Sequence, residues 1–254
     1  FAFFIILFVM HINNTNLPKK ILSWYDNNQR TLPWRIVKNS KNKQYYRLLS
    51  EFMLQQTQVK TVIPFFNNFI KIIPNLKVLS NIKESKVLKL WEGLGYYRRA
   101  KNLHKTSKIL IKRYNGKIPN NFEELKKLPG IGDYTANILL ALIYNQPRIG
   151  LDGNVKRVLS RVFNIDKLNK SFLFHTTRNS DLAEALMEFG SLICKPKEPR
   201  CNECKINKMC LFYKSKPNIK NKKKIKVKIK SYDVFCYLRK NKKQIALTKN
   251  NNLS

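Results

Sequence analysis

The stretch "KKLPGIGDYTANILLALIYNQPRIGLDGNVKRVLSR", from Lys126 to Arg161, decides the fold. Gly130 and Gly132 allow a tight turn whose backbone N–H groups point outward at the start of a helix, which favours an anion. Helical patterns flank the turn on both sides. The stretch therefore predicts a helix-hairpin-helix that holds a nucleic-acid phosphate without reading bases. An ordinary turn between two helices fits the glycines equally well.

The charge of the chain points to the same kind of partner. Among 254 residues, Lys and Arg number 50 and Asp and Glu 15, which gives a formal net charge of +35. A field of this sign attracts a polyanion, and nucleic acid is the first candidate. AT-rich coding, which inflates Lys, Asn and Ile together, accounts for part of the lysine content. It does not explain the scarcity of acids.

The apolar pattern predicts helices over most of the chain. From about Pro18 to Tyr213, apolar residues recur at spacings of three and four, with Pro and Gly between the segments. A lysine-dense linker follows over 214–230, and "SYDVFCYLRKNKKQIALTKNN" then predicts two short strands around a polar turn. Two strands do not make a stable domain, so we expect 231–254 to be the start of a truncated one.

The first residues are apolar but form no membrane anchor or secretory signal by pattern. The opening "FAFFIILFVM" is too short to span a bilayer and lacks a basic flank. We therefore set residues 1–17 apart as an extension that need not be native.

Four of the five cysteines are crowded together, at Cys194, Cys201, Cys204 and Cys210. In a chain without a credible secretory signal, this crowding favours metal ligation over a disulfide framework. Four thiolates suit a tetrahedral zinc ion or a 4Fe-4S cluster, and the spacing does not choose between them. Interleaved Lys and Arg suit phosphate contact, while a purely structural staple would also explain the cysteines. We expect the fifth, Cys236, to be buried in a strand.

Two carboxylates suggest chemistry. The segment "LLSEFMLQQTQV" places Glu51 among apolar residues of a helix that we expect to be buried. Burial raises the pKa of a carboxyl group, which suits a general acid at neutral pH. With Asp152, Glu51 would form a pair of the kind that cleaves glycosidic bonds through an oxocarbenium-like transition state. A structural buried glutamate is the alternative, and the sequence separation leaves open whether the two carboxylates meet.

Five sequence blocks occur in order before the four cysteines. They are "WYDNNQRTLPWR" (Trp24–Arg35), "SEFMLQQTQVKTVIPFF" (Ser50–Phe66), "WEGLGYYRRAKNLHK" (Trp91–Lys105), "LPGIGDYTA" (Leu128–Ala136) and "LDGNVKRVLSR" (Leu151–Arg161). Together they resemble the adenine DNA glycosylases of the MutY family, within the helix-hairpin-helix and iron–sulfur glycosylase superfamily. The resemblance spans about residues 18–213, and the blocks "MLQQTQV" and "LDGNVKR" are individually specific.

The resemblance implies an all-α helix-hairpin-helix DNA glycosylase fold. A six-helix barrel over about 40–150, with the hairpin motif at 121–144, would pack on an iron–sulfur domain built from 18–39 and 151–213. A 4Fe-4S cluster is then implied rather than zinc. Residues 231–254 would be the truncated start of a Nudix-like α/β domain that recognises 8-oxoguanine.

The resemblance also implies an activity. The enzyme would flip and hydrolytically remove adenine mispaired with 8-oxoguanine or guanine in double-stranded DNA, as a monofunctional step of base excision repair. It would act as a monomer in the bacterial cytoplasm, at the nucleoid, without a membrane partner.

Individual roles carry over residue by residue. Glu51 would protonate the flipped adenine at N7, and Asp152 would stabilise the positive sugar before water adds. Tyr134 and Asn154 match positions that contact the surroundings of Asp152 and the sugar or water. The residues matching those near the adenine pocket, in the space vacated by the base or at the bound phosphate are Arg35, Gln55, Gln56, Tyr96, Gly130 and Gly132.

Two alternatives stay open. Endonuclease III-like glycosylase/lyases carry a lysine nucleophile in the hairpin, where this chain has Tyr134. A non-catalytic DNA-binding fragment is favoured by the segment 164–181, which is about a dozen residues shorter than in the family, and by the truncated tail. The complete set of carboxylates and cysteines argues against that fragment. Gln44 stands where the family commonly has proline, which we interpret as a minor change.

Overall fold

The computed structural model describes residues 16–36, 42–165, 174, 176–215, 236–238 and 245–247. The chain forms two units, Phe1–Pro217 and Asn218–Ser254. Most of the extension 1–17 and of the linker 214–230, and half of the short segment 164–181, lies outside the described residues.

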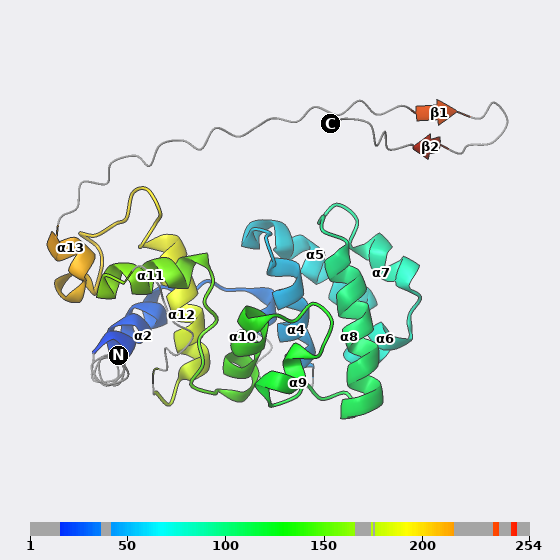
Figure 1. The fold of residues 1–254 in the computed structure, drawn as a ribbon, viewed down its shortest axis with the longest axis horizontal. Coiled ribbons are helices and arrows are strands. Elements are labelled where there is room, and N and C mark those ends of the chain that lie inside the picture. The colour runs from blue at the N-terminus through cyan, green and yellow to red at the C-terminus, as the bar shows by residue number, and fades with distance from the viewer. Residues whose placement is uncertain are drawn as a thin grey trace. The chain divides into compact units, whose positions relative to one another are not determined.

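The described part of the first unit is helical, which confirms the predicted fold class (Figure 1). Its elements, in chain order, are α2 (Leu17–Asn28), α3 (Pro33–Ile36), α4 (Lys43–Leu54), α5 (Val59–Ile72), α6 (Leu76–Asn81), α7 (Glu84–Leu90), α8 (Arg98–Tyr114), α9 (Phe122–Lys126), α10 (Asp133–Tyr144), α11 (Gly153–Phe163), α12 (Asn179–Leu192), the 3₁₀ turn η1 (Asn207–Met209) and α13 (Leu211–Ser215).

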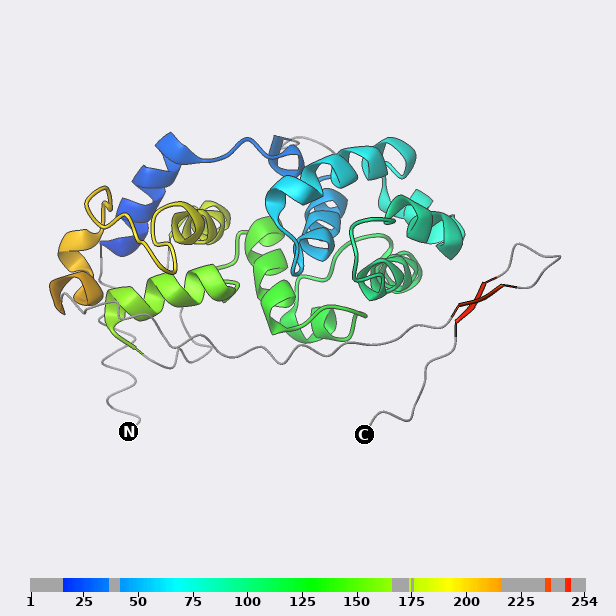
Figure 2. The ribbon, with the colours of Figure 1, turned by 90° about the horizontal axis from the view of Figure 1, so that it is seen from above.

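Two apolar cores divide the first unit into two lobes. The core of the first, which we call the hairpin lobe, is built from α3 to α10 and contains the buried rings of Phe52, Phe66, Phe69 and Trp91. The core of the second, the cysteine lobe, is built from α2, α11, α12 and the loop that carries the four cysteines. Helix α10 packs against α12 where the lobes meet, and Figure 2 shows these two helices side by side.

The predicted helix-hairpin-helix is confirmed. Asn121 begins α9, and its Oδ1 accepts hydrogen bonds from the N–H groups of Glu123 at 2.8 Å and Glu124 at 3.1 Å. A turn then leads to α10, which Gly132 precedes as the N-cap residue. Gly130 adopts φ +82°, and a Cβ atom there would lie 2.8 Å from Cε1 of Phe52. A side chain at position 130 would therefore strain the backbone and collide with the core.

The second unit contains a short hairpin among its described residues. Strand β1 (Cys236–Leu238) pairs antiparallel with β2 (Ile245–Leu247), with Cys236 opposite Leu247. The two predicted strands are present, while their membership of a Nudix-like domain stays a prediction. Within the described ranges, no helix is both long and apolar enough to cross a membrane.

Gln44 has a defined place where proline was expected. Its Oε1 accepts a hydrogen bond from the backbone N–H of Ile118 at 3.2 Å. The side chain thus ties the start of α4 to the segment between α8 and α9.

Candidate active site

A pocket of about 490 Å³ opens where the two lobes meet. This volume is in the range of small-molecule sites. Five of the residues singled out from the sequence line it, and they come from both lobes: Arg35, Glu51, Tyr134, Asp152 and Asn154. The question that sequence separation left open is therefore answered, since Glu51 and Asp152 face the same space.

Glu51 is buried on α4, with 5% of its surface exposed. Burial is the main cause that raises its pKa, to about 7, and the negative charges of Glu184 and Asp152 add to the rise. The guanidinium of Arg47 and a hydrogen bond with the hydroxyl of Tyr134 act in the opposite direction. A carboxyl group that titrates near neutrality is suited to give a proton to a substrate and to recover it.

Asp152 is held at the beginning of α11. It is the N-cap residue, and its Oδ1 accepts a hydrogen bond from the N–H of Val155 at 2.7 Å. Its Oδ2 accepts another from Nδ2 of Asn154 at 3.2 Å. Both carboxylate oxygens therefore have fixed partners, and the side chain is oriented by the start of the helix.

Tyr134 lines the same pocket and forms a hydrogen bond with Glu51. Burial is the main cause that raises its pKa well above the usual value, with further contributions from Glu51 and Asp152. Its ring leaves no room for a side chain at Gly150, where a Cβ atom would lie 2.8 Å from Cε2 of the tyrosine. Gly190 meets Asn154 in the same way, because a Cβ atom there would lie 2.7 Å from Cβ of Asn154. Two glycines therefore permit the close packing behind the pocket.

Arg35 lies in a buried ionic network on the α12 side of the pocket. Its Nε donates to Oε1 of Glu184 at 2.8 Å, and its Nη1 donates to Oε1 of Glu188. Tyr25 donates its hydroxyl to Oε2 of Glu184 at 2.9 Å, and the backbone N–H of Arg30 donates to Oε2 of Glu188 at 3.2 Å. Burial opposes the charge of Arg35, but the two glutamates together leave its pKa raised.

Gln55, Gln56 and Tyr96 do not line the pocket but lie on two loops beside it. Gln56 and Tyr96 both have positive φ, +57° and +49°, and Tyr96 is 60% exposed. Arg99 ties the two loops together: its Nη1 donates to the carbonyl of Gln55 at 2.5 Å, and its Nη2 donates to that of Gly95 at 3.1 Å. Its guanidinium also stacks 5.3 Å from the ring centroid of Tyr96.

Gln55 connects these loops to the hairpin. Its Nε2 donates to the carbonyl of Gly130 at 3.2 Å. Gly132 is exposed, and the space where its Cβ atom would lie is open. The hairpin thus presents a helix N-terminus to solvent beside the loop of Gln55, which suits a phosphate group.

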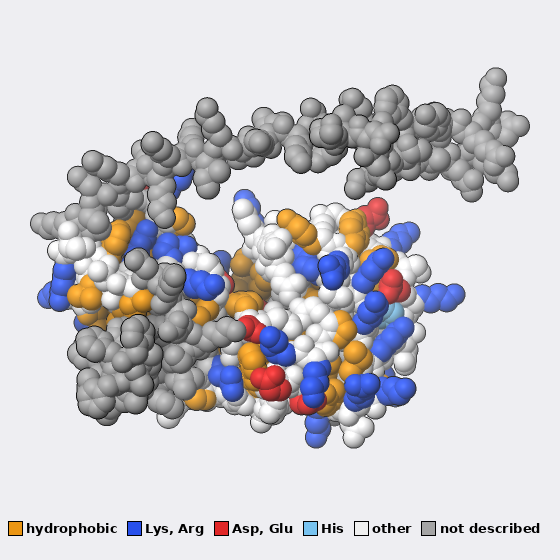
Figure 3. All heavy atoms as spheres, viewed as in Figure 1, with side chains coloured by type: hydrophobic (Ala, Val, Ile, Leu, Met, Phe, Trp, Pro, Cys, Tyr) orange, Lys and Arg blue, Asp and Glu red, His pale blue; other side chains and the backbone are white. Residues whose placement is uncertain are grey.

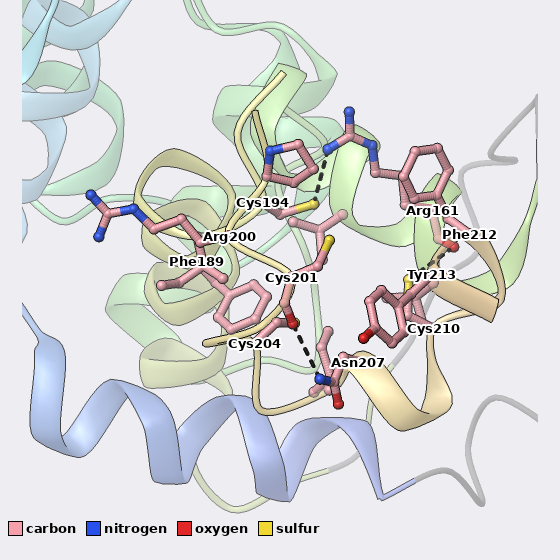
Figure 4. A pocket seen from close by; sticks show the side chains of 15 residues that line it. Arg161, Phe189, Cys194, Arg200, Cys201, Cys204, Asn207, Cys210, Phe212 and Tyr213 are labelled. Carbon is pink, nitrogen blue, oxygen red and sulfur yellow. Dashed lines mark hydrogen bonds between the residues drawn. The ribbon is translucent and has the colours of Figure 1, made fainter. Parts of the chain in front are cut away.

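The four predicted cysteine ligands line one apolar pocket, shown in Figure 4. Burial raises the pKa of the thiols of Cys201, Cys204 and Cys210, that of Cys204 to about 11. Arg161 reaches into this group, with its Nη1 3.4 Å from Sγ of Cys194. In the part of the chain that the structure describes, no three His, Cys, Asp or Glu side chains converge as ligands of a single metal ion. Four thiols around one pocket are a donor set that suits either a tetrahedral zinc ion or a 4Fe-4S cluster.

Arg157 connects the cysteine loop to the candidate active site. Its Nε donates to the carbonyl of Cys194 at 2.7 Å, and its Nη2 donates to the carbonyl of Gly190 at 2.7 Å and to Oδ1 of Asn154 at 2.8 Å. Asn154 in turn donates to Asp152. Arg157 thus links the loop at Cys194 to Asn154, the hydrogen-bond partner of Asp152.

Several residues of the site were not found from the sequence. They are Arg30, Trp34, Arg47, Arg99, Arg157, Glu184, Met187 and Glu188. One signal was available: "LAEALMEFG" carries two glutamates four residues apart on an otherwise apolar helix, a spacing that puts both on one face. The arginines are hidden in the general excess of basic residues.

Basic side chains cover much of the visible face of the hairpin lobe. Figure 3 shows Lys and Arg gathered over α6, α7 and α8. Exposed lysines recur along α8 at Lys101, Lys105, Lys108 and Lys112. This face carries the charge expected for contact with a polyanion.

Comparison with known proteins supports the same reading. The family model described as HhH-GPD superfamily base excision DNA repair protein matches residues 49–177. A protein named adenine DNA glycosylase from Buchnera aphidicola subsp. Baizongia pistaciae is 44% identical over 207 residues, which are 76% of this chain and 57% of that protein. The chain spans less than two thirds of the length of the first relatives that it matches.

Solved structures agree on the fold. A thermostable thymine-DNA glycosylase is similar with a TM-score of 0.68 at 25% identity, over 78% of this chain and 95% of that one. A non-covalent complex of endonuclease III with DNA gives a TM-score of 0.65 at 22% identity, over 79% and 94% of the two chains. The second likeness concerns the fold alone.

Proposed function

Because the chain belongs to the HhH-GPD superfamily of base excision DNA repair proteins, we propose that it is a DNA glycosylase that removes adenine mispaired with 8-oxoguanine or guanine. One observation carries the proposal. A buried carboxyl group with a pKa of about 7, Glu51, and a second carboxylate, Asp152, line one pocket between two lobes. A carboxyl group with a raised pKa that shares a pocket with a second carboxylate is the arrangement that glycosidic cleavage needs.

The proposed chemistry uses each carboxylate once. Glu51 gives its proton to N7 of the flipped adenine, and the C1′–N9 bond breaks with its electron pair going to the base. Asp152 stabilises the positive charge that develops on the sugar. Water then forms a bond to C1′ and loses a proton to the solvent, which leaves an abasic site. Tyr134 and Asn154 position the two carboxylates through their hydrogen bonds.

The proposed substrate is double-stranded DNA. The hairpin at Gly130 and Gly132 would hold a phosphate, while Gln55, Gln56 and Tyr96 would enter the space left by the flipped base and contact the opposite strand. Flipping costs a few kcal/mol of unstacking and pairing, and less at a mispair, so selectivity begins before the chemical step. The exposure and positive φ of Gln56 and Tyr96 support this role.

The proposed cofactor is a 4Fe-4S cluster held by Cys194, Cys201, Cys204 and Cys210. When bound, the cluster would fix the loop that carries these residues. Arg161 supports the assignment, because its contact with the first thiol places a positive charge beside a group that must ionise to bind iron.

The remaining parts of the proposal concern state and place. Both proposed catalytic carboxylates come from one chain, which supports a monomer. We propose the cytoplasm of a bacterium, at the nucleoid, because a bacterial relative is 44% identical and the proposed substrate is DNA.

The test is single-turnover release of free adenine from duplexes that pair adenine with 8-oxoguanine, guanine or thymine. We expect adenine release from the duplexes with 8-oxoguanine and with guanine. The abasic DNA strands should stay intact until alkali cleaves them. A glycosylase/lyase would form a Schiff base through a lysine such as Lys60, which lines the pocket. Borohydride traps that Schiff base and so separates lyase chemistry from hydrolytic release. A trapped protein–DNA adduct with strand cleavage would support a glycosylase/lyase instead. Tight binding without base release by protein that contains its full iron would support a binding fragment.

A further inference from the structure

Helix α4 carries a second buried charge one turn before Glu51. Arg47 is 6% exposed, and its Nη1 donates to Oε1 of Glu184 on α12. Residues four apart share one face of a helix, so the Arg47 guanidinium and the Glu51 carboxyl group are neighbours on α4. The ion pair therefore joins the two lobes directly beside the candidate acid.

Glu184 is an ionised partner for this arginine. Burial alone would raise its pKa, but Arg47 and Arg35 hold that pKa below the usual value. Arg35 divides its donors between Glu184 and Glu188, and Glu188 lies within 3.4 Å of Arg30 as well. Arg47 thus adds the second guanidinium at Oε1 of Glu184.

The geometry of Arg47 is not that of a well-satisfied staple. Its Nε is buried without a hydrogen-bond partner among the described residues. Arg99, in the same lobe, also leaves Nε unpaired, but its two terminal nitrogens donate to five backbone carbonyls. A buried N–H without a partner costs free energy. We therefore look for the role of Arg47 in its positive charge as well as in its hydrogen bond to Glu184.

The charged and titratable groups that face Glu51 come from every element around the pocket. They are Arg30 between α2 and α3, Arg35 on α3, Arg47 on α4, Lys60 on α5, Tyr134 on α10, Asp152 before α11, and Glu184 and Glu188 on α12. Burial first, then Glu184 and Asp152, favour the protonated form of Glu51, whereas Arg47 is the strongest influence toward the ionised form.

We propose that Arg47 is a positioning residue for the acid: with Glu184 it forms a charge pair whose balance decides how readily Glu51 gives up its proton. The inference rests on the proposed function, because it concerns the same proton transfer. Removing the charge of Arg47 should favour the protonated form of Glu51, and removing the charge of Glu184 should favour its ionised form. A purely structural pair would instead lower activity or stability without moving the pH range of the reaction.

The test compares three variants of the full chain with its iron in place: R47M, which keeps length and removes charge, E184Q, and R47K, which keeps the charge. The rate of single-turnover adenine release is measured against pH. We expect the alkaline limb to move up by about one pH unit in R47M and down by a similar amount in E184Q. R47K should keep the limb near that of the unmodified protein.

The inference is overturned if the alkaline limb stays in place in both R47M and E184Q, or if it moves in the same direction in the two variants. If R47M does not fold, the downward shift in E184Q and the unchanged limb in R47K decide the matter. A second readout is independent of catalysis: the carboxyl ¹³C resonance of Glu51, assigned by its absence in E51Q, should titrate at a higher pH in R47M. If the unmodified protein releases no adenine, the proposed function fails, and this titration still decides the role of Arg47.

Discussion

The hairpin lobe and the cysteine lobe both use arginine to hold a loop, but the two loops are completed differently. In the hairpin lobe, Arg99 donates to the carbonyls of Gln55 and Gly95 above a core of fully buried aromatic rings. In the cysteine lobe, Arg157 and Arg161 donate to carbonyls of the cysteine loop, such as those of Cys194 and Lys195.

The difference lies in the groups that each loop presents. The two loops at Arg99 present backbone carbonyls that accept from its guanidinium, whereas the cysteine loop presents thiols whose pKa burial raises, that of Cys204 to about 11. Such thiols gain their natural partner when a metal binds and displaces the protons. We therefore expect the hairpin lobe to be stable by itself and the cysteine lobe to depend on the proposed cluster.

The largest expected effect comes from removing one ligand. Cys204→Ser should lose iron and lower the thermal transition by about 5 °C or more, roughly 2 kcal/mol at this chain length. Hydrogen exchange should rise in α11 and α12 and stay slow in the core of α4 and α8. Cys236→Ser is the matched control, because it removes a thiol from another unit. Full iron content and an unchanged transition in C204S would contradict the dependence of this lobe on the proposed cluster.

The next effect concerns the acid at the boundary between the lobes. The pKa of Glu51 rises from 4.5 to about 7 on folding, so its protonated form stabilises the protein below pH 4.5. That stability is lost as pH rises through about 7. Relative to E51Q, the unmodified protein should lose about 3 kcal/mol over this range.

Urea unfolding at pH 4.5, 6 and 8 measures this difference. Glu92→Gln on the exposed surface after α7 is the matched control and should follow the unmodified protein at each pH. A constant difference between E51Q and the unmodified protein would mean that Glu51 is not buried with a raised pKa.

Two glycines of the hairpin should separate stability from DNA binding. Gly130→Ala places a Cβ atom 2.8 Å from Phe52 in a backbone with φ +82°, so it should lose about 1–3 kcal/mol of stability. Gly132→Ala meets open space at an ordinary φ and should leave stability nearly unchanged. It should still weaken duplex binding, because the methyl group would stand where a phosphate approaches. Equal effects of the two variants on stability would contradict the geometry of the turn.

The smallest effect belongs to the surface of the cysteine lobe. Arg178 pairs with Asp26 at 2.6 Å, but both side chains are more than 40% exposed. Exposed ion pairs contribute little, so Asp26→Asn should move the thermal transition by no more than about 2 °C. A larger loss would show that this lobe relies on its surface pairs as well as on the proposed cluster.

The sequence predicts the local devices well. The hairpin is one of the two interpretations that two glycines between helical patterns allow, and the crowding of four cysteines predicts that they lie together. Each of these depends on neighbours within a few residues, and such neighbours are visible in a sequence.

The long-range ionic network is another matter. Arg35 and Glu188 are 153 residues apart, and Arg47 and Glu184 are 137 apart. In a chain with 50 basic residues, nothing in the sequence marks which arginines are buried. From composition alone, every arginine is expected on the surface. A few are buried only because the fold brings the glutamates of α12 next to α4.

The central claim is that each lobe supplies one carboxylate to a single glycosylase site. The most direct measurement is the rate of single-turnover adenine release from a duplex with adenine opposite 8-oxoguanine, for E51Q and D152N beside the unmodified protein. We predict that each substitution slows release by about 10²–10⁴-fold while duplex binding persists. Release at the unmodified rate by either variant would contradict the claim.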